Sequence, residues 1–349
     1  MTVLLRADAN AEIGIGHVMR CVSLGIRLIN EGHSVHLASA EIPETVIGWI
    51  SKEGIGFSKL PFNCTSNTEF DVVETCRVAN ELGEVEWVVV DHYGLDARWE
   101  NSIRANGNRV MVIDDLADRS HDCDVLLDPG MQEDRKTRYE GLVPEGTAML
   151  LGPEYALLRP EFDDPAYQRS RSGRIEKLLV YLGGGAGIGD EILKILSAIA
   201  GLRLHAVDTT VVLGPIEFAE GLKVRILQEH PLVLVLVHTG AMASLMRDAD
   251  LAIGTCGSAG WERCALGVPA LTVLSAENQR DDTVHLAHCG AIRHLGDLGV
   301  LTTRTWRDEL TYLMLNPSAV ESMGRAASTV LAGRRRALRI LEGVFNGAH

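Results

Sequence analysis

The sequence has few of the features that mark secreted, membrane-spanning or nucleic-acid-binding proteins. Its seven cysteines are odd in number and include no CxxC pair, which favours reduced thiols over a disulfide framework or a zinc site. No apolar run approaches the roughly 18 residues that a membrane span requires, and MTVLLRAD at the N-terminus lacks a charged-then-apolar signal segment. The net charge of −14 disfavours nucleic-acid binding. We therefore expect a cytoplasmic protein with no membrane insertion and no nucleic-acid partner.

The composition that remains is that of an ordinary globular enzyme. Hydrophobic residues make up 46% of the chain and charged residues 23%. With 349 residues, the chain exceeds the size at which a single hydrophobic core keeps growing, so two domains are expected. The acidic balance does not argue against a small anionic substrate, because backbone N–H groups and a few local cations can hold one.

Short β-rich runs alternate with helical stretches along the whole chain. Because nearly all the β-rich runs are apolar throughout, they indicate parallel sheets covered on both faces, that is, doubly wound α/β domains. The strands that we predict lie at residues 2–7, 33–39, 86–91, 109–114 and 124–128 in the first half and at 177–182, 209–213, 232–238, 250–254 and 269–274 in the second.

A segment rich in Pro, Arg, Ser and Asp separates the halves and predicts a linker. The domains that we expect are an N-terminal domain at 1–160, a linker at 161–175, a second domain at 176–330, and a basic C-terminal helix within 331–349 that packs back onto the first domain. Two doubly wound domains that face each other form a cleft where ligands commonly bind.

The first motif with chemical content is RAD followed by EIGIGHVMR. Arg6 and Asp8 stand at a predicted strand end, where they can contact a substrate. Gly14 and Gly16 allow a tight turn and close approach of the backbone to a ligand. His17 then begins a helix, whose positive N-terminal end disfavours imidazolium and favours a neutral base. The alternative is a capping loop with a bystander histidine.

A second motif, Asp91-His92-Tyr93-Gly94, follows the apolar run WVVV. Polar residues at the carboxyl end of a buried parallel strand occupy the place where such folds build sites. Tyr93 can hydrogen-bond a sugar, and Asp91 can orient either His17 or His92. The alternative is a strand-end turn that Gly94 closes.

Carboxylates cluster after the next predicted strand, in DDLADRSHDCD. We expect no metal there, because no HxxE, HExxH or EF-hand spacing is present. Asp118 with Arg119 is typical of an ion pair, and Asp122 with Asp124 of a solvated turn.

Two glycine-rich loops in the second half follow predicted strands and open helices. The run at 183–187, which includes Gly184, offers amides for an anion but is weak evidence. The second loop, GTCGSAGWERCALGVP, places Gly257 and Ser258 where a helix N-terminus suits phosphate oxygens. Glu262 lies one turn later and can hold ribose hydroxyls. A further strand end supplies Glu277, Asn278 and Gln279.

These residues support a family resemblance. GSxGWERCxLGxPxL with AENQ resembles the nucleotide-binding signature of GT-B-fold enzymes related to the peptidoglycan N-acetylglucosaminyltransferase. RADANAEIGIGHVMRC, with VVDHYGLD, VIDDLADRSHDCDVLLD and LLGPEYALLRPEF, resembles the UDP-2,4-diacetamido-2,4,6-trideoxy-β-L-altropyranose hydrolases of pseudaminic acid biosynthesis, over about residues 2–290.

The resemblance implies a GT-B-like fold of two Rossmann-like domains facing across a cleft, and a hydrolase that needs no metal or cofactor. Its substrate would be a UDP-activated diacetamido sugar, cleaved at the anomeric C1–O bond with inversion. His17 matches the catalytic histidine of the family, Tyr93 its active-site tyrosine and Asn278 the asparagine of its ENQ motif. The resemblance also assigns Glu262 to the ribose and Gly257 with Ser258 to the diphosphate. No protein partner is implied.

One departure concerns the sugar. The family often has LLDQN where this chain has Leu126-Leu-Asp128-Pro129-Gly130.

Three other functions use the same scaffold or motif: a glycosyltransferase that uses a UDP-activated amino sugar, a non-catalytic UDP-sugar binder, and a 2-epimerase of UDP-N-acetylglucosamine. Fold alone does not separate them, because function depends on the site that the fold carries.

Overall fold

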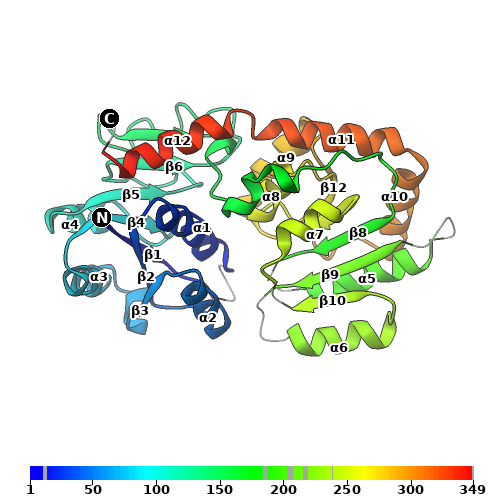
Figure 1. Cartoon of the computed structure of the whole chain (residues 1–349), viewed down its shortest axis with the longest axis horizontal. Helices are drawn as coiled ribbons and strands as arrows, with labels where there is room; N and C mark the ends of the chain where they lie inside the picture. Colours follow the sequence, from blue (N-terminus) through cyan, green and yellow to red (C-terminus); the bar gives the residue numbers. More distant parts are fainter. Residues whose placement is uncertain (11–13, 184–186, 203–206, 215–218, 238, 348–349) are drawn as a thin grey trace. The chain divides into compact units, whose positions relative to one another are not determined.

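The computed structural model of the chain describes residues 1–10, 14–183, 187–202, 207–214, 219–237 and 239–347. The chain forms two compact units, which we call the first and the second unit. The first unit consists of Met1–Pro160 together with Gly333–His349, and the second of Glu161–Ala332. Each unit is built on its own parallel sheet with helices packed against it (Figure 1).

The sheet of the first unit has seven parallel strands in the order β3-β2-β1-β4-β5-β6-β7. Central β1 pairs with β2 on one side and β4 on the other, so that Leu5 lies between Leu37 and Val89. The strands are β1 (Thr2–Ala7), β2 (Ser34–Ser39), β3 (Gly56–Lys59), β4 (Val85–Asp91), β5 (Arg109–Ile113), β6 (Val125–Asp128) and β7 (Ala148–Leu151).

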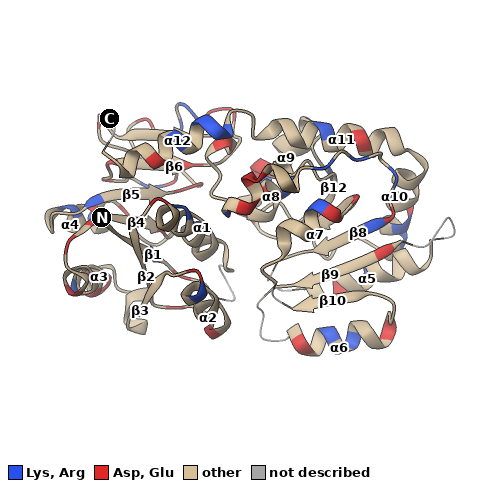
Figure 2. Ribbon diagram, in the orientation of Figure 1, with Lys and Arg blue, Asp and Glu red and all other residues tan. Residues whose placement is uncertain are grey.

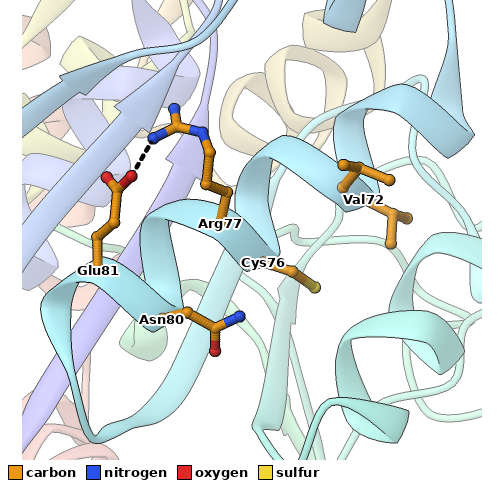
Figure 3. Close-up of a pocket in the computed structure, with 6 residues that line it drawn as sticks. Val72, Cys76, Arg77, Asn80 and Glu81 are labelled. Carbon is orange, nitrogen blue, oxygen red and sulfur yellow. Dashed lines mark hydrogen bonds and ion pairs between the residues drawn. The ribbon is translucent and has the colours of Figure 1, made fainter.

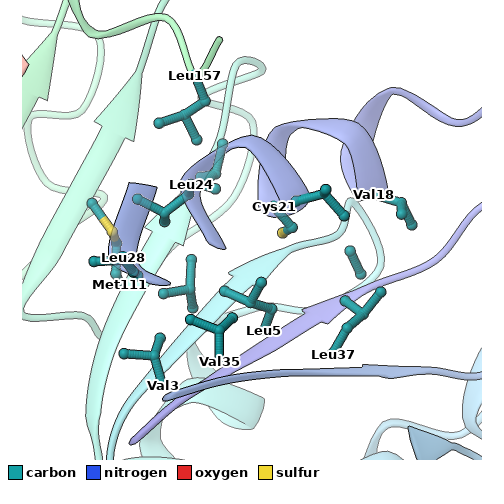
Figure 4. Packing of buried hydrophobic residues seen from close by; sticks show 14 of the residues in the cluster. Val3, Leu5, Val18, Cys21, Leu24, Leu28, Val35, Leu37, Met111 and Leu157 are labelled. Atoms are coloured by element: carbon teal, nitrogen blue, oxygen red, sulfur yellow. The ribbon is translucent and has the colours of Figure 1, made fainter. Parts of the chain in front are cut away.

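Helix α1 covers β1 and β2 in the first unit. Buried residues recur along it every three to four positions, at Val18, Cys21, Leu24 and Leu28, and pack with Leu5 and Leu37 of the sheet (Figure 4). The helices of this unit are α1 (Gly16–Asn30), α2 (Glu44–Lys52), α3 (Thr68–Leu82), α4 (Ala97–Ala105) and α12 (Arg334–Phe345), with the 3₁₀ helices η1 (Phe62–Thr65) and η2 (Pro153–Tyr155).

Helix α12 belongs to the first unit although it comes from the far end of the chain. Leu341 and Phe345 lie in the core that α1 and the sheet form, and the Phe345 ring is 5.2 Å from that of Trp87. Arg334 donates to the carbonyl of Ala156 at 2.6 Å. The other basic residues of this helix lie on its solvent side, where Figure 2 marks them in blue.

The sheet of the second unit has six parallel strands in the order β10-β9-β8-β11-β12-β13. Its central strands are buried on both faces, as their unbroken apolar sequences require. The strands are β8 (Lys177–Tyr181), β9 (Asp208–Leu213), β10 (Leu234–Val237), β11 (Leu251–Gly254), β12 (Ala270–Leu274) and β13 (Arg293–Asp297).

Helices pack against both faces of this second sheet. Helix α5 packs against α10, where the buried Trp306 Nε1 donates to Glu191 Oε1 at 2.6 Å. The helices are α5 (Ile188–Ala200), α6 (Ala219–Glu229), α7 (Met242–Asp248), α8 (Ser258–Ala265), α9 (Arg280–His288), α10 (Thr303–Leu315) and α11 (Pro317–Val330), with η3 (Pro160–Asp163), η4 (Pro165–Tyr167) and η5 (Glu277–Gln279). Among the described residues, no helix combines the length and apolarity that a membrane crossing needs.

The segment 161–175, which the sequence predicts as a linker, is bound to the second unit. Arg169 forms an ion pair with Asp250 at 2.7 Å. The buried Arg171 guanidinium donates to the carbonyls of Met246 and Leu266, at 2.9 and 2.8 Å. This irregular stretch is therefore held by arginines on backbone oxygens in addition to the buried side chains of Phe162 and Ile175.

Both sheets have a topological switch point at a central strand. In the first unit, the chain moves from β1 toward one edge with β2 and β3, then returns to the other side of β1 with β4. The second unit does the same around β8, with β9 and β10 on one side and β11 on the other. The carboxyl ends at such points are where open α/β sheets bind ligands.

The predicted strands of both halves are confirmed, with end shifts of one or two residues. Three strands were missed: β3, β7 and β13, each at the edge of its sheet. β3 (GFSK) and β13 (RHLGD) contain polar residues and are half-buried or exposed, so they lack the apolar run that identifies central strands. β7 (AMLL) is apolar but only four residues long, which is too short to stand out in the sequence.

Candidate functional site

The switch point of the first unit places His17 against Asp91. His17 is the second residue of α1, which follows β1, and Asp91 is the last residue of β4. The Nδ1 atom of His17 is 3.1 Å from the backbone oxygen of Asp91 and 3.1 Å from its Oδ1 atom. Because both neighbours are acceptors, Nδ1 carries the proton, and a neutral ring has its lone pair on Nε2. Of the two histidines that Asp91 was predicted to orient, the structure selects His17.

Arg20 holds the same carboxylate from the other side. It lies one turn after His17 on α1, and its Nε and Nη2 atoms donate to the two oxygens of Asp91 at 2.8 Å each. Burial alone would raise the pKa of Asp91, but the charge of Arg20 and the hydrogen bond with His17 outweigh burial and lower that pKa below its usual value. Asp91 is therefore an anion that accepts hydrogen bonds from Arg20 and lies against His17 Nδ1.

Tyr93 and Asp115 complete this group. The Tyr93 ring meets the His17 ring edge-on, with centroids 4.4 Å apart. Its hydroxyl donates to Asp115 Oδ1 at 2.8 Å, and Asp115 Oδ2 accepts from Arg20 Nη1 at 2.6 Å. We call His17, Arg20, Asp91, Tyr93 and Asp115 the histidine cluster. Sequence reasoning assigned no role to Arg20 or Asp115, although the i, i+3 spacing of His17 and Arg20 puts both on one helix face.

Arg6 and Asp8 are buried beside this cluster and bonded to each other. Arg6 Nη1 donates to Asp8 at 2.7 Å, and its Nη2 to Asp71 at 2.6 Å. His92 accepts from the N–H of Gly94 through Nδ1, so its Nε2 carries the proton that faces Asp8 at 3.3 Å. Burial opposes the charge of Asp8, but His92 and Arg6 lower its pKa. Arg6 and Asp8, which were predicted to contact the substrate, are thus hydrogen-bonded to other side chains of the protein.

The predicted glycines of the first loop differ in what they require. Gly14 has a φ of +72°, a conformation that L side chains rarely adopt, and its N–H bonds to the carbonyl of Asn10. Gly16 begins α1, and a Cβ there would meet nothing within 4 Å. The backbone therefore explains glycine at position 14, whereas no packing explains it at position 16.

The acidic cluster after β5 is bonded to protein groups. The Tyr139 hydroxyl lies 3.0 Å from both Asp114 Oδ2 and Asp128 Oδ2, and Arg138 pairs with Asp128 at 3.2 Å. Burial raises the pKa of Asp128 to about 6 despite the hydrogen bond from the Gly130 amide and the charge of Arg138. Arg138 and Tyr139 carry no sequence signal for this role, because the chain folds back to reach the cluster.

Other members of the acidic cluster have partners of their own. Asp118 forms the predicted ion pair with Arg119, at 2.9 Å, and Asp122 bonds to Arg104. Within the described ranges, no group of three His, Cys, Asp or Glu side chains is arranged to hold a metal.

The switch point of the second unit carries a loop of backbone donors. After β11, residues 255–257 lead into α8, whose N-cap is Gly257. Among the described residues, the N–H groups of Cys256, Gly257 and Ser258 donate to no protein acceptor, and the Ser258 hydroxyl makes no hydrogen bond. Free amides at a helix N-terminus are suited to an anion. Gly184, the other predicted anion contact, lies outside the described residues.

The remaining predicted residues of this unit lie on α8 and η5. Gln279 reaches Gly257: its Nε2 atom would lie 3.3 Å from a Cβ there, and its Oε1 accepts from Ser275 at 3.2 Å. Glu277 is exposed and pairs with Arg280 at 2.6 Å, so its carboxylate is directed along its own helix turn. Asn278 is exposed, and Glu262 is half-buried in the first turns of α8.

A shallow depression elsewhere in the first unit has a different character. It lies along one face of α3 and is lined by residues of that helix alone, among them Val72, Cys76 and Asn80 (Figure 3). Arg77 and Glu81 form an ion pair across its end at 2.6 Å. A single helix face with an internal ion pair lacks the convergent polar groups of a binding site.

Comparison with known proteins points to nucleotide-sugar enzymes. No family model matches the chain. It is 26% identical over 212 residues to the UDP-2,4-diacetamido-2,4,6-trideoxy-β-L-altropyranose hydrolase of Campylobacter jejuni, a match that covers 60% of this chain and 70% of that enzyme. It is 28% identical over 155 residues to the spore coat polysaccharide biosynthesis protein SpsG of Bacillus subtilis, covering 44% of this chain and 45% of that protein.

Solved structures establish the fold. MurG of Acinetobacter baumannii superimposes with a TM-score of 0.61 at 16% identity, over 98% of this chain and 99% of that chain. A putative UDP-N-acetylglucosamine 2-epimerase of Listeria monocytogenes gives 0.64 at 13% identity, over 99% and 97%. The chain therefore has the GT-B fold, and its sequence is similar to that of the Campylobacter UDP-sugar hydrolase.

Proposed function

We propose that this protein hydrolyses a UDP-activated 2,4-diacetamido sugar to UDP and the free sugar. The observation that carries the proposal is the pairing of His17 Nδ1 with Asp91, which leaves Nε2 as the basic nitrogen of a neutral ring. The similarity to the Campylobacter hydrolase supplies the substrate class, UDP-2,4-diacetamido-2,4,6-trideoxy-β-L-altropyranose. Polysaccharide biosynthesis, named for the Bacillus relative, is consistent with that class.

The reaction needs one base and one anion site. A water oxygen bonds to the anomeric C1 of the sugar while the C1–O bond to the diphosphate breaks and its electron pair leaves with UDP. The proton of that water passes to His17 Nε2. The imidazolium so formed lies against Asp91, whose low pKa keeps it anionic. Such a pair orients the ring and stabilises its charge without taking the proton.

Arg6 and Asp8 serve this reaction indirectly in our proposal. Asp8 accepts hydrogen bonds from Arg6, His92 and Ser39. Because these bonds tie the end of β1 to the end of β4, Arg6 and Asp8 fix the strand ends that position His17 and Asp91. Tyr93 positions the His17 ring from its edge and extends the site toward the sugar.

The second unit holds UDP in our proposal. The free amides of residues 256–258 and the Ser258 hydroxyl bind the diphosphate, and Glu262 holds the ribose. Asn278 and Gln279, at the neighbouring strand end, contact the diphosphate or the sugar, and Gln279 already lies over Gly257. Glu277, which pairs with Arg280, has a supporting role.

The test is UDP release from UDP-2,4-diacetamido-2,4,6-trideoxy-β-L-altropyranose in plain buffer with a chelator and no acceptor. Stoichiometric UDP and free sugar, identified by mass spectrometry, are expected. Release only on addition of an acceptor would identify a glycosyltransferase instead. A product that keeps UDP but has changed stereochemistry would identify an epimerase.

The His17→Gln variant tests the base. Turnover is expected to fall by about 10²–10⁴-fold, the usual contribution of general acid–base catalysis, while UDP affinity measured by calorimetry is unchanged. His36→Gln is the matched control, because His36 lies in β2 and bonds to Ser58 of the edge strand β3, so this variant should keep full turnover. Equal turnover of His17→Gln and wild type would exclude the proposed base.

A further inference from the structure

Arg263 is a buried guanidinium directly beneath the loop that opens α8. It is 2% exposed. Its Nη2 atom donates to the carbonyl of Thr255 at 2.5 Å, and its Nη1 atom would lie 2.7 Å from a Cβ placed on Gly254. Its Nε atom is buried and has no hydrogen-bond partner. In the described part of the chain, no carboxylate forms an ion pair with Arg263. The Thr255 carbonyl is therefore the acceptor that partly compensates its buried positive charge.

Two other buried arginines, Arg6 and Arg171, have more partners than Arg263. Arg6 lies between the carboxylates of Asp8 and Asp71. Arg171, in the same unit as Arg263, donates to backbone oxygens at the ends of α7 and α8, including those of Met246, Ala249 and Leu266. Because a buried charge without such partners is costly, the position of Arg263 indicates that its counter-charge comes from outside the chain.

The bond to Thr255 also determines which way the loop presents its donors. In a trans peptide, the C=O and N–H groups point in opposite directions. Since the Thr255 carbonyl points at Arg263, on the buried side, the N–H of Cys256 points away from it. That amide and those of Gly257 and Ser258 are the donors without protein acceptors. Arg263 thus orients the first donor of the loop and adds a positive charge behind it.

We propose that Arg263 is the buried cation of the anion site at the start of α8 and that the diphosphate of UDP is its counter-ion. The inference rests on the proposed function, because it takes the ligand from there. It adds a residue that is almost fully buried and acts through the Thr255 carbonyl and through its charge. Such a residue should govern affinity for the diphosphate and leave affinity for the nucleoside unchanged.

The experiment compares UDP and uridine binding by calorimetry in wild type, Arg263→Met and Arg263→Lys. Methionine fills similar volume without charge, so the variant without ligand should be at least as stable as wild type in urea. UDP affinity of Arg263→Met should fall about tenfold or more, since a charge within several ångströms acts in a poorly screened interior. Uridine affinity should not change, and Arg263→Lys should recover part of the UDP affinity.

Arg171→Met is the matched control. It removes another buried guanidinium from the same unit but one bonded to helix-end carbonyls, so it should lower stability and leave UDP affinity unchanged at temperatures where it is folded. Equal UDP affinity of Arg263→Met and wild type would overturn the inference, as would parallel losses for UDP and uridine. Absence of UDP binding by wild type would instead refute the proposed function.

Discussion

The two units build their candidate sites at the same place in the same kind of sheet but from different chemical groups. The edge of the first unit is occupied by charged side chains paired with one another, as in the histidine cluster. At the edge of the second unit, the described residues include backbone amides and the Ser258 hydroxyl without protein acceptors, with Arg263 buried beneath them. The topology therefore determines where a site lies, and the side chains determine whether it handles protons or holds an anion.

The largest difference in stability between the two units is expected when one polar side chain is removed at the carboxyl ends of the strands in each sheet. Asp91→Asn leaves the half-buried Arg20 without an acceptor for one of its two bonds to the buried side chain at position 91, so the free energy of unfolding should fall by about 3 kcal/mol or more. Ser258→Ala in the second unit removes a hydroxyl without protein partners, so stability should change by less than about 0.5 kcal/mol, while UDP affinity falls. Urea unfolding and calorimetry measure both. Similar stability losses at the two edges would erase the contrast.

The next effect concerns the dependence of stability on pH. Asp128 has an unfolded pKa near 3.8 and a folded pKa of about 6, so between these values the folded state binds more protons and stability falls as pH rises. This one group should account for a loss on the order of 2–3 kcal/mol between pH 4 and pH 7. Asp128→Asn should remove that part of the slope in urea unfolding series.

Glu277→Gln is the counterpart in the second unit. The exposed Glu277 carboxylate bonds to Arg280, which lowers its pKa from the usual 4.5, so it is ionised between pH 5 and pH 7. Its removal should leave the slope between pH 5 and pH 7 as in wild type. A wild-type slope in Asp128→Asn would show that Asp128 is ionised in the fold over this range.

The smallest effect is expected at Tyr93. Tyr93→Phe keeps the ring against His17 but loses the hydrogen bond from the hydroxyl to Asp115. The free energy of unfolding should fall by about 1–2 kcal/mol. Turnover should fall by about fivefold to tenfold, because His17 is held less firmly. Tyr93→Ala, which also removes the ring, should lower turnover further. A loss in Tyr93→Phe as large as in Tyr93→Ala would assign the hydroxyl a direct part in the chemistry.

Much of the fold was predictable because central parallel strands must be apolar throughout. β1, β4, β8 and β11 are such strands, and each was located from its sequence within a residue or two. β3 and β13 were not, because an edge strand can be polar and still pair with one neighbour, and β7 was not, because its apolar run has only four residues. The glycine loop before α8 was also readable, since a loop that opens a helix has a local pattern.

The composition of each site was less predictable than its location. His17, Asp91 and Tyr93 were candidates from strand-end position, yet Arg20 and Asp115 were recognised only from their bonds. Arg263 follows Glu262 directly in a helix, and nothing local distinguishes it from a surface arginine. Its burial depends on how α8 packs against the loop.

The sequence by itself determined the α/β class, the central strands and the glycine turns, because those depend on local periodicity and on backbone conformations that few residues adopt. The tertiary structure alone decided that β4 and β11 cross to the other side of β1 and β8, and that Asp91 meets His17 and Arg20 across more than 70 residues. Strand order and ion pairing depend on which distant surfaces bury one another, and that information is not contained in any short stretch of the chain.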